Sequence, residues 1–168
     1  MITETAIQEL IRCPKQALKA ERRRMLAENR SLRNAVTLIS TNEKYTFKLF
    51  LRQSLEFSED FSVGLIWTNA VKHIGIGKDI ILIRYQGPHD SGKPFGEDLH
   101  NEYHVHEISP EDIKNRRYLR PGNKSVSRDF SSFSGAFFSF VDYCSILGLE
   151  TLIDYSQFPP LNQLSLFD

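Results

Sequence analysis

The sequence has 168 residues, of which 40% are hydrophobic and 25% are charged, and its formal net charge is zero. These values are ordinary for one globular domain and exclude a fibrous or wholly disordered chain. Cys13 and Cys144 are too far apart in the sequence to indicate a disulfide framework or a zinc ribbon. The acidic first residues do not resemble a secretory signal, and no run of eighteen apolar residues occurs. We therefore expect a cytoplasmic protein with no cofactor, no bound metal and no membrane partner.

The neutral total hides two basic stretches. Residues 15–33 contain seven Lys or Arg against two Glu, and residues 114–128 contain six Lys or Arg and no acidic residue. Either stretch could contact the phosphates of DNA or RNA, or it could be the solvated face of a helix. The candidate nucleic-acid-binding residues are Arg22, Arg23, Arg24, Arg116, Arg117 and Arg120.

The first elements in chain order are helical. Apolar residues at helical spacing over residues 3–12 predict a short helix, and the composition up to about Arg30 predicts a second, solvated one. From residue 35 the pattern changes. Residues 36–39 are short and β-branched, and residues 45–51 alternate between apolar and polar, so both stretches are expected to be strands. The turn at residues 41–43 suits a hairpin between them.

Further strands are predicted downstream. Residues 61–67 alternate again, and the apolar run at residues 80–83 is typical of a strand that is covered on both faces. A polar strand follows at about residues 99–108. Residues 109–112 then combine an N-cap serine, a first-turn proline and a capping-box carboxylate, which predicts a short helix.

The last expected element is a long aromatic helix. Between Phe130 and Leu147, apolar residues recur at intervals of three and four, and Gly148 ends the run. The fold class is therefore α+β. We expect an antiparallel meander of about five strands, covered on one face by this helix, with helices at the N-terminus. Residues 1–154 should form one domain, and residues 155–168, which contain Pro159-Pro160, an extended docking tail.

The tail contains the pentapeptide QLSLF, formed by Gln163, Leu164, Ser165, Leu166 and Phe167. It resembles the peptide Gln-Leu-Ser/Asp-Leu-Phe by which polymerases, repair proteins and initiation regulators dock on the bacterial DNA sliding clamp, and all five positions agree. The resemblance implies that Leu166 and Phe167 fill an apolar pocket of the clamp, with Leu164 in a neighbouring pocket and the Gln163 amide at the rim. The alternative is a terminal segment packed on the protein's own surface.

Four of the five histidines lie between His89 and His106. On a regular strand, alternate side chains share a face, which here would gather Asp98, His100, Glu102, His104 and His106. Leu99, Tyr103 and Val105 would point the other way, toward a core. His104 and His106 with His89, Arg84 and Tyr103 would suit acid–base cleavage of a phosphodiester. A metal site is less favoured because the sequence fixes no third ligand. The alternative is a solvated edge strand.

The segment from residue 45 to residue 107 also resembles small bacterial toxin families such as TumE. In these, a strand ending in Arg-Tyr, here Arg84-Tyr85, and a Pro-His element, here Pro88-His89, precede a histidine-rich strand. The resemblance implies ribonuclease-like or toxin character for Arg84, His89, His104 and His106, and an antitoxin as partner. The aromatic helix and the QLSLF tail are not part of that pattern.

Two functions follow from these patterns. The favoured one is a replication-associated interaction protein that docks on the sliding clamp and needs no active site. The other is an enzyme, a small nuclease or toxin that uses the histidine strand.

Overall fold

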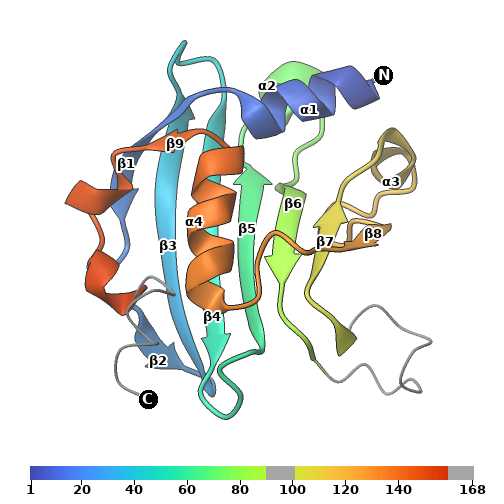
Figure 1. Cartoon of the computed structure of the whole chain (residues 1–168). Helices are drawn as coiled ribbons and strands as arrows, with labels where there is room; N and C mark the ends of the chain where they lie inside the picture. The colour runs from blue at the N-terminus through green and yellow to red at the C-terminus, as the bar shows by residue number, and fades with distance from the viewer. Residues whose placement is uncertain (90–100, 159–168) are drawn as a thin grey trace.

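A computed structural model describes residues 1–89 and 101–158, and one large mixed sheet dominates the fold (Figure 1). Nine strands are ordered β8-β7-β6-β5-β4-β3-β1-β9, with β2 also paired to β3, and every pair except β1–β9 is antiparallel. The strands are β1 Lys15–Ala20, β2 Leu26–Glu28, β3 Ser31–Ser40, β4 Thr46–Ser54, β5 Phe61–Trp67, β6 Ile80–Gln86, β7 His104–Glu107, β8 Asn123–Val126 and β9 Ile146–Leu147. The α-helices of the described residues are α1 Glu4–Arg12, α2 Val71–Ile74, α3 Pro110–Lys114 and α4 Phe133–Tyr143.

The central meander is confirmed, but the sheet is larger than expected. The strands predicted at residues 36–39, 45–51, 61–67 and 80–83 lie within β3, β4, β5 and β6, which pair consecutively. The estimate of about five strands is wrong, because β1, β2, β8 and β9 also join the sheet. These four lie at its two sides, where their short sequences carry little periodic signal.

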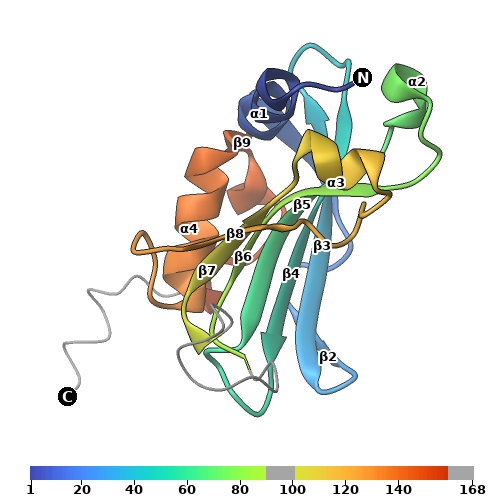
Figure 2. The ribbon, with the colours of Figure 1, turned by 90° about the vertical axis from the view of Figure 1, so that its right-hand side faces the viewer.

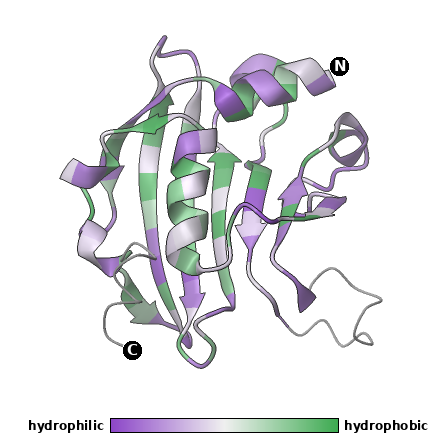
Figure 3. Ribbon diagram, viewed as in Figure 1, coloured by the Kyte–Doolittle hydropathy of each residue, from purple (hydrophilic) through white to green (hydrophobic). Residues whose placement is uncertain are grey.

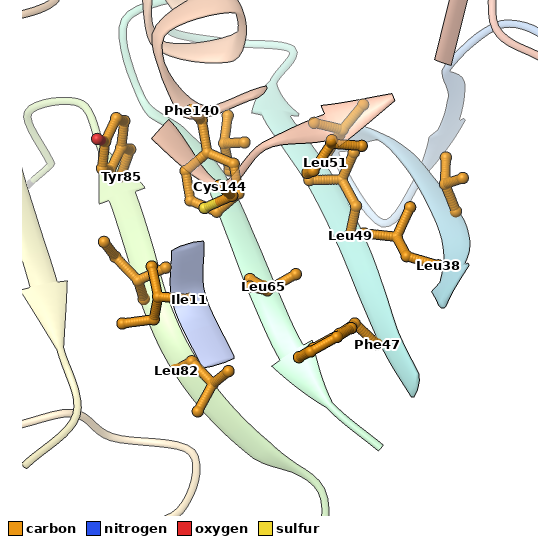
Figure 4. Packing of buried hydrophobic residues seen from close by; sticks show 14 of the residues in the cluster. Ile11, Leu38, Phe47, Leu49, Leu51, Leu65, Leu82, Tyr85, Phe140 and Cys144 are labelled. Atoms are coloured by element: carbon orange, nitrogen blue, oxygen red, sulfur yellow. The ribbon is translucent and has the colours of Figure 1, made fainter. Parts of the chain in front are cut away.

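The core lies between one face of the sheet and the helices α1 and α4 (Figures 1 and 2). Apolar side chains recur at every second position of β4 and β5, so that Leu49, Leu51 and Leu65 are buried on this face, and the hydropathy bands along the strands follow the same period (Figure 3). Figure 4 shows these side chains beside Phe140 of α4 and Ile11 of α1. The opposite face, which we call the second face, carries the other half of the alternating residues.

The aromatic helix is shorter than the sequence suggested. Ser132 caps α4 by accepting a hydrogen bond from the Gly135 amide at 3.0 Å, and the helix ends at Tyr143 rather than near residue 147. Cys144 is the C-cap and Ser145 has a φ of 52°, so the chain leaves the helix and enters β9, which pairs with β1. Phe130 precedes the helix, yet its ring stacks on Tyr85 at 4.9 Å and prolongs the aromatic layer.

The second N-terminal helix is not formed, because the segment expected to form it contains β1 and β2. Pro14 gives the local reason: a residue before proline is pushed out of the helical region, and Cys13 has an extended ψ of 142°. Ala17 then packs into the core, and this burial outweighs the helix propensity of a Lys-, Gln- and Ala-rich segment.

Lys15 is fully buried, and its ammonium has three acceptors. Nζ donates to the carbonyl oxygens of Ile11, Cys13 and Cys144 at 2.7, 2.8 and 2.9 Å. It therefore joins the C-terminal ends of α1 and α4, where backbone carbonyls lack helical partners and a cation is favoured. Burial lowers the pKa of Lys15.

The packed part of the chain continues to the last described residue. Tyr155–Gln157 forms a 3₁₀ turn, and Phe158 is buried with its ring stacked on Phe137 at 4.0 Å. The expected tail at 155–168 therefore begins no earlier than residue 159, and Gln163 to Phe167 lie outside the described residues. Among the described residues, no helix is long and apolar enough to cross a membrane.

Candidate functional site

Two polar rows cross the second face where β4 to β8 lie side by side. Directly opposite residues of antiparallel strands point to the same side, so the register fixes which side chains are neighbours. One row is Phe50, Gly64, Arg84, His106 and Lys124. The other is Arg52, Ser62, Gln86, His104 and Val126. Basic and imidazole side chains from four strands are thereby brought together.

His104 is completely buried, and both of its ring nitrogens are engaged. Nδ1 donates to the Glu102 carbonyl at 2.6 Å, and Nε2 lies 3.1 Å from Oε1 of Gln86. The Gln86 amide donates in turn to Oγ of Ser62 at 3.1 Å. These contacts fix the orientation of the His104 ring beneath the surface.

A cavity of about 550 Å³ opens beside this network. Its lining residues are Arg84, Gln86, His89, His106, Leu119, Arg120, Pro121, Gly122 and Lys124. The ring of His104 lies 5.4 Å from that of His89 and 4.8 Å from that of His106, both of which reach the cavity. We call this space the histidine cavity. Two imidazoles line it, and the third supports them from below.

The environment of His106 disfavours its charged form. Burial lowers the pKa of His106 to about 3, with further contributions from the nearby charges of Arg84, His104 and Lys124, while the Pro121 carbonyl, 3.3 Å from Nδ1, acts in the opposite sense. The imidazole is therefore neutral near pH 7.

Arg84 is a cation with spare hydrogen-bonding capacity. Its Nε is buried and has no hydrogen-bond partner among the residues the structure describes. Burial and the neighbouring charge of Arg52 lower its pKa, so both effects favour an anion as the missing partner. Arg84 stands directly opposite His106 in the β6–β7 register.

The wall of the cavity formed by residues 119–122 is held by Asp112, whose side chain is 1% exposed. Its carboxylate accepts hydrogen bonds from the amides of Ser109 and Gly122, both at 3.0 Å, and from Nε of Arg117 at 2.9 Å. Burial alone would raise the pKa of Asp112, but these hydrogen bonds outweigh it and lower the pKa. The capping box predicted at Ser109 and Asp112 is confirmed, and its carboxylate also anchors the loop.

The structure places the predicted catalytic residues on different faces. Arg84, His89 and His106 line the cavity, whereas Tyr103 packs on Phe61 and Phe130 on the core side, as strand alternation indicated. The alternative of a solvated edge strand is wrong, because β7 pairs with both β6 and β8 and its two histidines are at most 3% exposed. Asp98, Leu99 and His100 lie outside the described residues.

The two groups of arginines also separate. Arg22, Arg23 and Arg24 connect β1 with β2, at the far side of the sheet from β7 and β8 (Figure 1). Arg22 faces Glu28 at 3.8 Å, and Arg24 pairs with Asp154. By contrast, Arg120 lines the histidine cavity, and Arg116 and Arg117 lie close to it in the same loop.

Sequence reasoning did not identify Gln86, Lys124 or Asp112 as parts of this site. The signal for Gln86 was its place on β6, two residues after Arg84 and therefore on the same face. The signal for Lys124 was its place in the basic stretch 114–128. Asp112 was predicted only as a capping-box carboxylate, because its contact with Gly122 is not encoded by the capping pattern.

Within residues 1–89 and 101–158, no three His, Cys, Asp or Glu side chains are grouped as a metal site. No protein-family model, curated protein or solved structure matches this chain.

Proposed function

We propose that this protein is a small nuclease that cleaves RNA at the histidine cavity. The observation that carries the proposal is the lining of that cavity. His89 and His106 share it with Arg84, Arg120 and Lys124, and none of the described residues that line it is acidic. A cationic, partly buried hollow with two imidazoles suits a phosphodiester anion and the proton transfers of its cleavage.

RNA carries its own nucleophile, so the chain needs to supply only proton transfer and charge stabilisation. In the proposed step the 2′-oxygen bonds to phosphorus while the bond from phosphorus to the 5′-oxygen breaks. Neutral His106 takes the proton of the 2′-hydroxyl, and His89 gives a proton to the leaving 5′-oxygen. The products are a 2′,3′-cyclic phosphate and a 5′-hydroxyl, and Arg84 and Lys124 stabilise the charge on the non-bridging oxygens.

A pKa of about 3 would make His106 a weak base if it persisted in the complex. A phosphate group in the cavity changes this. Its negative charge offsets the nearby cations and raises the pKa of His106 toward the range in which proton transfer is effective. Binding and activation are thus coupled in the proposal, and His104 acts as a positioning residue for both rings.

The test is cleavage of a dinucleoside monophosphate by the purified protein, with the cyclic product followed by phosphorus NMR. His106→Asn and Arg84→Gln should each lower kcat/KM by about 100-fold or more, as for loss of a general acid–base group or a charge-stabilising donor. His73→Asn is the matched control, since His73 is exposed on α2. Absence of cleavage by the unaltered protein, or full activity of His106→Asn, would overturn the proposal.

We also propose, independently, that Gln163 to Phe167 dock on a bacterial DNA sliding clamp. The support is the agreement of all five residues of QLSLF with the docking peptide. Phe158 is the last described residue and is buried against α4, so only Pro159 to Asn162 separate this anchor from the peptide. For a peptide this small we expect an affinity of about micromolar.

Binding of the whole protein to a purified bacterial sliding clamp tests this second proposal. Leu166→Ala with Phe167→Ala should abolish binding, whereas Leu161→Ala, just before the peptide, should change the affinity less than about threefold. Failure of the intact chain to bind would eliminate the docking function and leave the nuclease proposal untouched.

A further inference from the structure

A second cavity of about 900 Å³ adjoins the histidine cavity on the same side of the sheet. The two share Leu119 and Arg120 as lining residues. The remaining residues that line the second cavity are Ile66, Gly77, Lys78, Asp79, Arg116, Arg117 and Tyr118. A ligand in the histidine cavity can therefore extend past Arg120 without crossing the core.

We propose that this second cavity is a nucleotide subsite for single-stranded RNA, adjacent to the scissile phosphate. The inference rests on the proposed ribonuclease function and adds a definite substrate class: a strand that continues past the cut on the side of Arg116 and Arg120. In this arrangement Arg120 contacts the phosphate between the two subsites. Arg116 contacts the next phosphate along.

The charges around the histidine cavity indicate the side toward which the RNA strand extends. Toward the loop between β4 and β5 lies another cavity, of about 720 Å³, whose lining includes Glu56, Glu59 and Asp60. Arg52 in that cavity is already paired with Asp60 at 2.6 Å. Phosphates on that side would meet the carboxylates of Glu56 and Glu59, so the RNA strand is favoured only toward the basic loop of residues 115–122, between α3 and β8.

The basic loop, by contrast, has cationic side chains that make no ion pair with the described residues. Arg116 and Arg120 are exposed and make no ion pair among the described residues, while Arg117 is held by Asp112 at 2.9 Å. Among the described residues, Asp79 is the one acidic residue that lines this second cavity. Two unpaired guanidinium groups at this place match two consecutive phosphates.

The apolar part of the second cavity indicates an unpaired base. Leu119 is 58% exposed, and Ile66 and Tyr118 are partly exposed beside it. Apolar and aromatic side chains stabilise a base by contact with its flat face, which is accessible when the base is splayed out of a single strand. In a duplex that face is stacked on neighbouring base pairs, so duplex RNA should be a poor ligand.

Backbone hydrogen bonds hold the loop that lines the subsite. The Ile81 amide donates to the Tyr118 carbonyl at 2.8 Å, which fixes the loop to β6, and the Arg117 amide donates to the Asp112 carbonyl at 2.8 Å. Ile81 and Arg84 are three residues apart on β6, a distance of about 10 Å along the strand. Neighbouring nucleotides of one strand can bridge that separation.

The experiment measures binding by the cleavage-blocked variant His106→Asn, with fluorescent oligoribonucleotides of two and eight residues. The informative quantity is the ratio of the two dissociation constants. We expect the octamer to bind about 50-fold more tightly than the dinucleotide, and a duplex of the same octamer sequence to bind at least about tenfold more weakly than the single strand. The salt dependence of octamer binding should include a contribution of about two phosphate contacts from this loop.

Two pairs of substitutions locate the effect. Arg116→Gln with Arg120→Gln should reduce the chain-length advantage to less than about fivefold. Arg23→Gln with Arg30→Gln is a matched control, since both arginines are exposed. Arg30 also shares the left-handed backbone conformation of Arg116, with a φ of 65° compared with 59°, so the two pairs of substitutions carry a similar backbone cost. Leu119→Ala should weaken octamer binding by about tenfold, and Leu26→Ala, which is 53% exposed on β2, should leave it unchanged.

The subsite is refuted if the octamer binds no better than the dinucleotide, or if the duplex binds as well as the single strand. It is also refuted if the Arg116 and Arg120 substitutions leave the ratio of the two dissociation constants unchanged, or if the control pair lowers that ratio equally. Each of these results is compatible with cleavage of the dinucleotide by the unaltered protein. Failure of the subsite is thus distinguishable from failure of the proposed nuclease.

Discussion

Arg84 and His106 stand directly opposite each other in the register of β6 and β7. Arg84 Nε is buried and has no hydrogen-bond partner within residues 1–89 and 101–158, and it is thereby placed beside an imidazole whose pKa burial lowers to about 3. This placement disfavours the charged form of His106, because a fixed cation and a desolvated titratable ring share one hollow. The protein maintains it through the surrounding strands, which is typical of binding and catalytic sites rather than of structural ion pairs.

The depressed pKa of His106 makes the folded protein sensitive to mild acid. The ordinary pKa of a histidine is 6.5, so His106 becomes protonated in the unfolded chain as the pH falls below that value. In the folded protein it stays neutral until about pH 3. Stability is therefore lost progressively across this window. Between pH 7 and pH 5 we expect His106 to account for a loss of about 2 kcal/mol in the free energy of unfolding, measured by urea denaturation.

His106→Gln should remove this part of the pH dependence, and His73→Gln should retain it. If the difference in stability between pH 7 and pH 5 is the same in His106→Gln as in the unaltered protein, His106 is not held neutral by the fold.

Phosphate binding should depend on pH in the opposite way to stability. An anion in the histidine cavity raises the pKa of His106, and linkage then requires that proton uptake accompany binding. The affinity for inorganic phosphate should consequently increase from pH 8 to pH 6, and the increase should exceed the part that comes from protonation of phosphate itself. Calorimetry in two buffers of different ionisation enthalpy measures the number of protons taken up on binding. His106→Asn should bind phosphate without that additional proton uptake.

Gly64 allows the ring of Phe50 to lie across β5 beside Arg84. A Cβ at residue 64 would come within 2.2 Å of two atoms of that ring. Gly64→Ala should therefore lower the free energy of unfolding by about 1–3 kcal/mol through overpacking. In a Phe50→Ala background the same substitution should cost much less, and this double-mutant cycle measures the contact. Equal costs in both backgrounds would contradict it.

Asp112 should matter for stability and for the histidine cavity together. Asp112→Asn removes the charge that accepts hydrogen bonds from Ser109, Gly122 and Arg117, and we expect a loss of about 2–4 kcal/mol in the free energy of unfolding. Amide hydrogen exchange of residues 117–122 should accelerate in this variant. Asp129→Asn, at an exposed position, is the control and should be nearly neutral. Unchanged exchange in Asp112→Asn would show that the loop is held by other contacts.

Lys15 should be more important for stability than any exposed lysine of the chain. Lys15→Met retains much of the side-chain volume but leaves the carbonyls of Ile11, Cys13 and Cys144 without their donor, at a cost of about 3–5 kcal/mol. Lys19→Met on the same strand is exposed and should change the midpoint of thermal unfolding very little. A comparable effect of both substitutions would argue against a capping role for Lys15.

Elements whose signals are local can be predicted from the amino-acid sequence alone. The alternation of apolar residues located β4 and β5, and the Ser109 to Asp112 pattern located the start of α3. Strand alternation also predicts correctly that Tyr103 points away from His104 and His106, which excludes Tyr103 from the catalytic group proposed from the sequence. These features can be predicted because the alternation along a strand and the cap of a helix depend on residues only a few positions apart.

The other features depend on contacts between segments that are distant in the sequence. The segment that contains β1 has a helix-forming composition, yet pairing with β3 and burial of Ala17 make it a strand. His104 and His106 would be exposed to solvent on an edge strand, but pairing with β8 and the loop held by Asp112 bury them. The site exists because backbone pairing brings distant segments together, and no local pattern encodes which polar side chains that pairing will make neighbours.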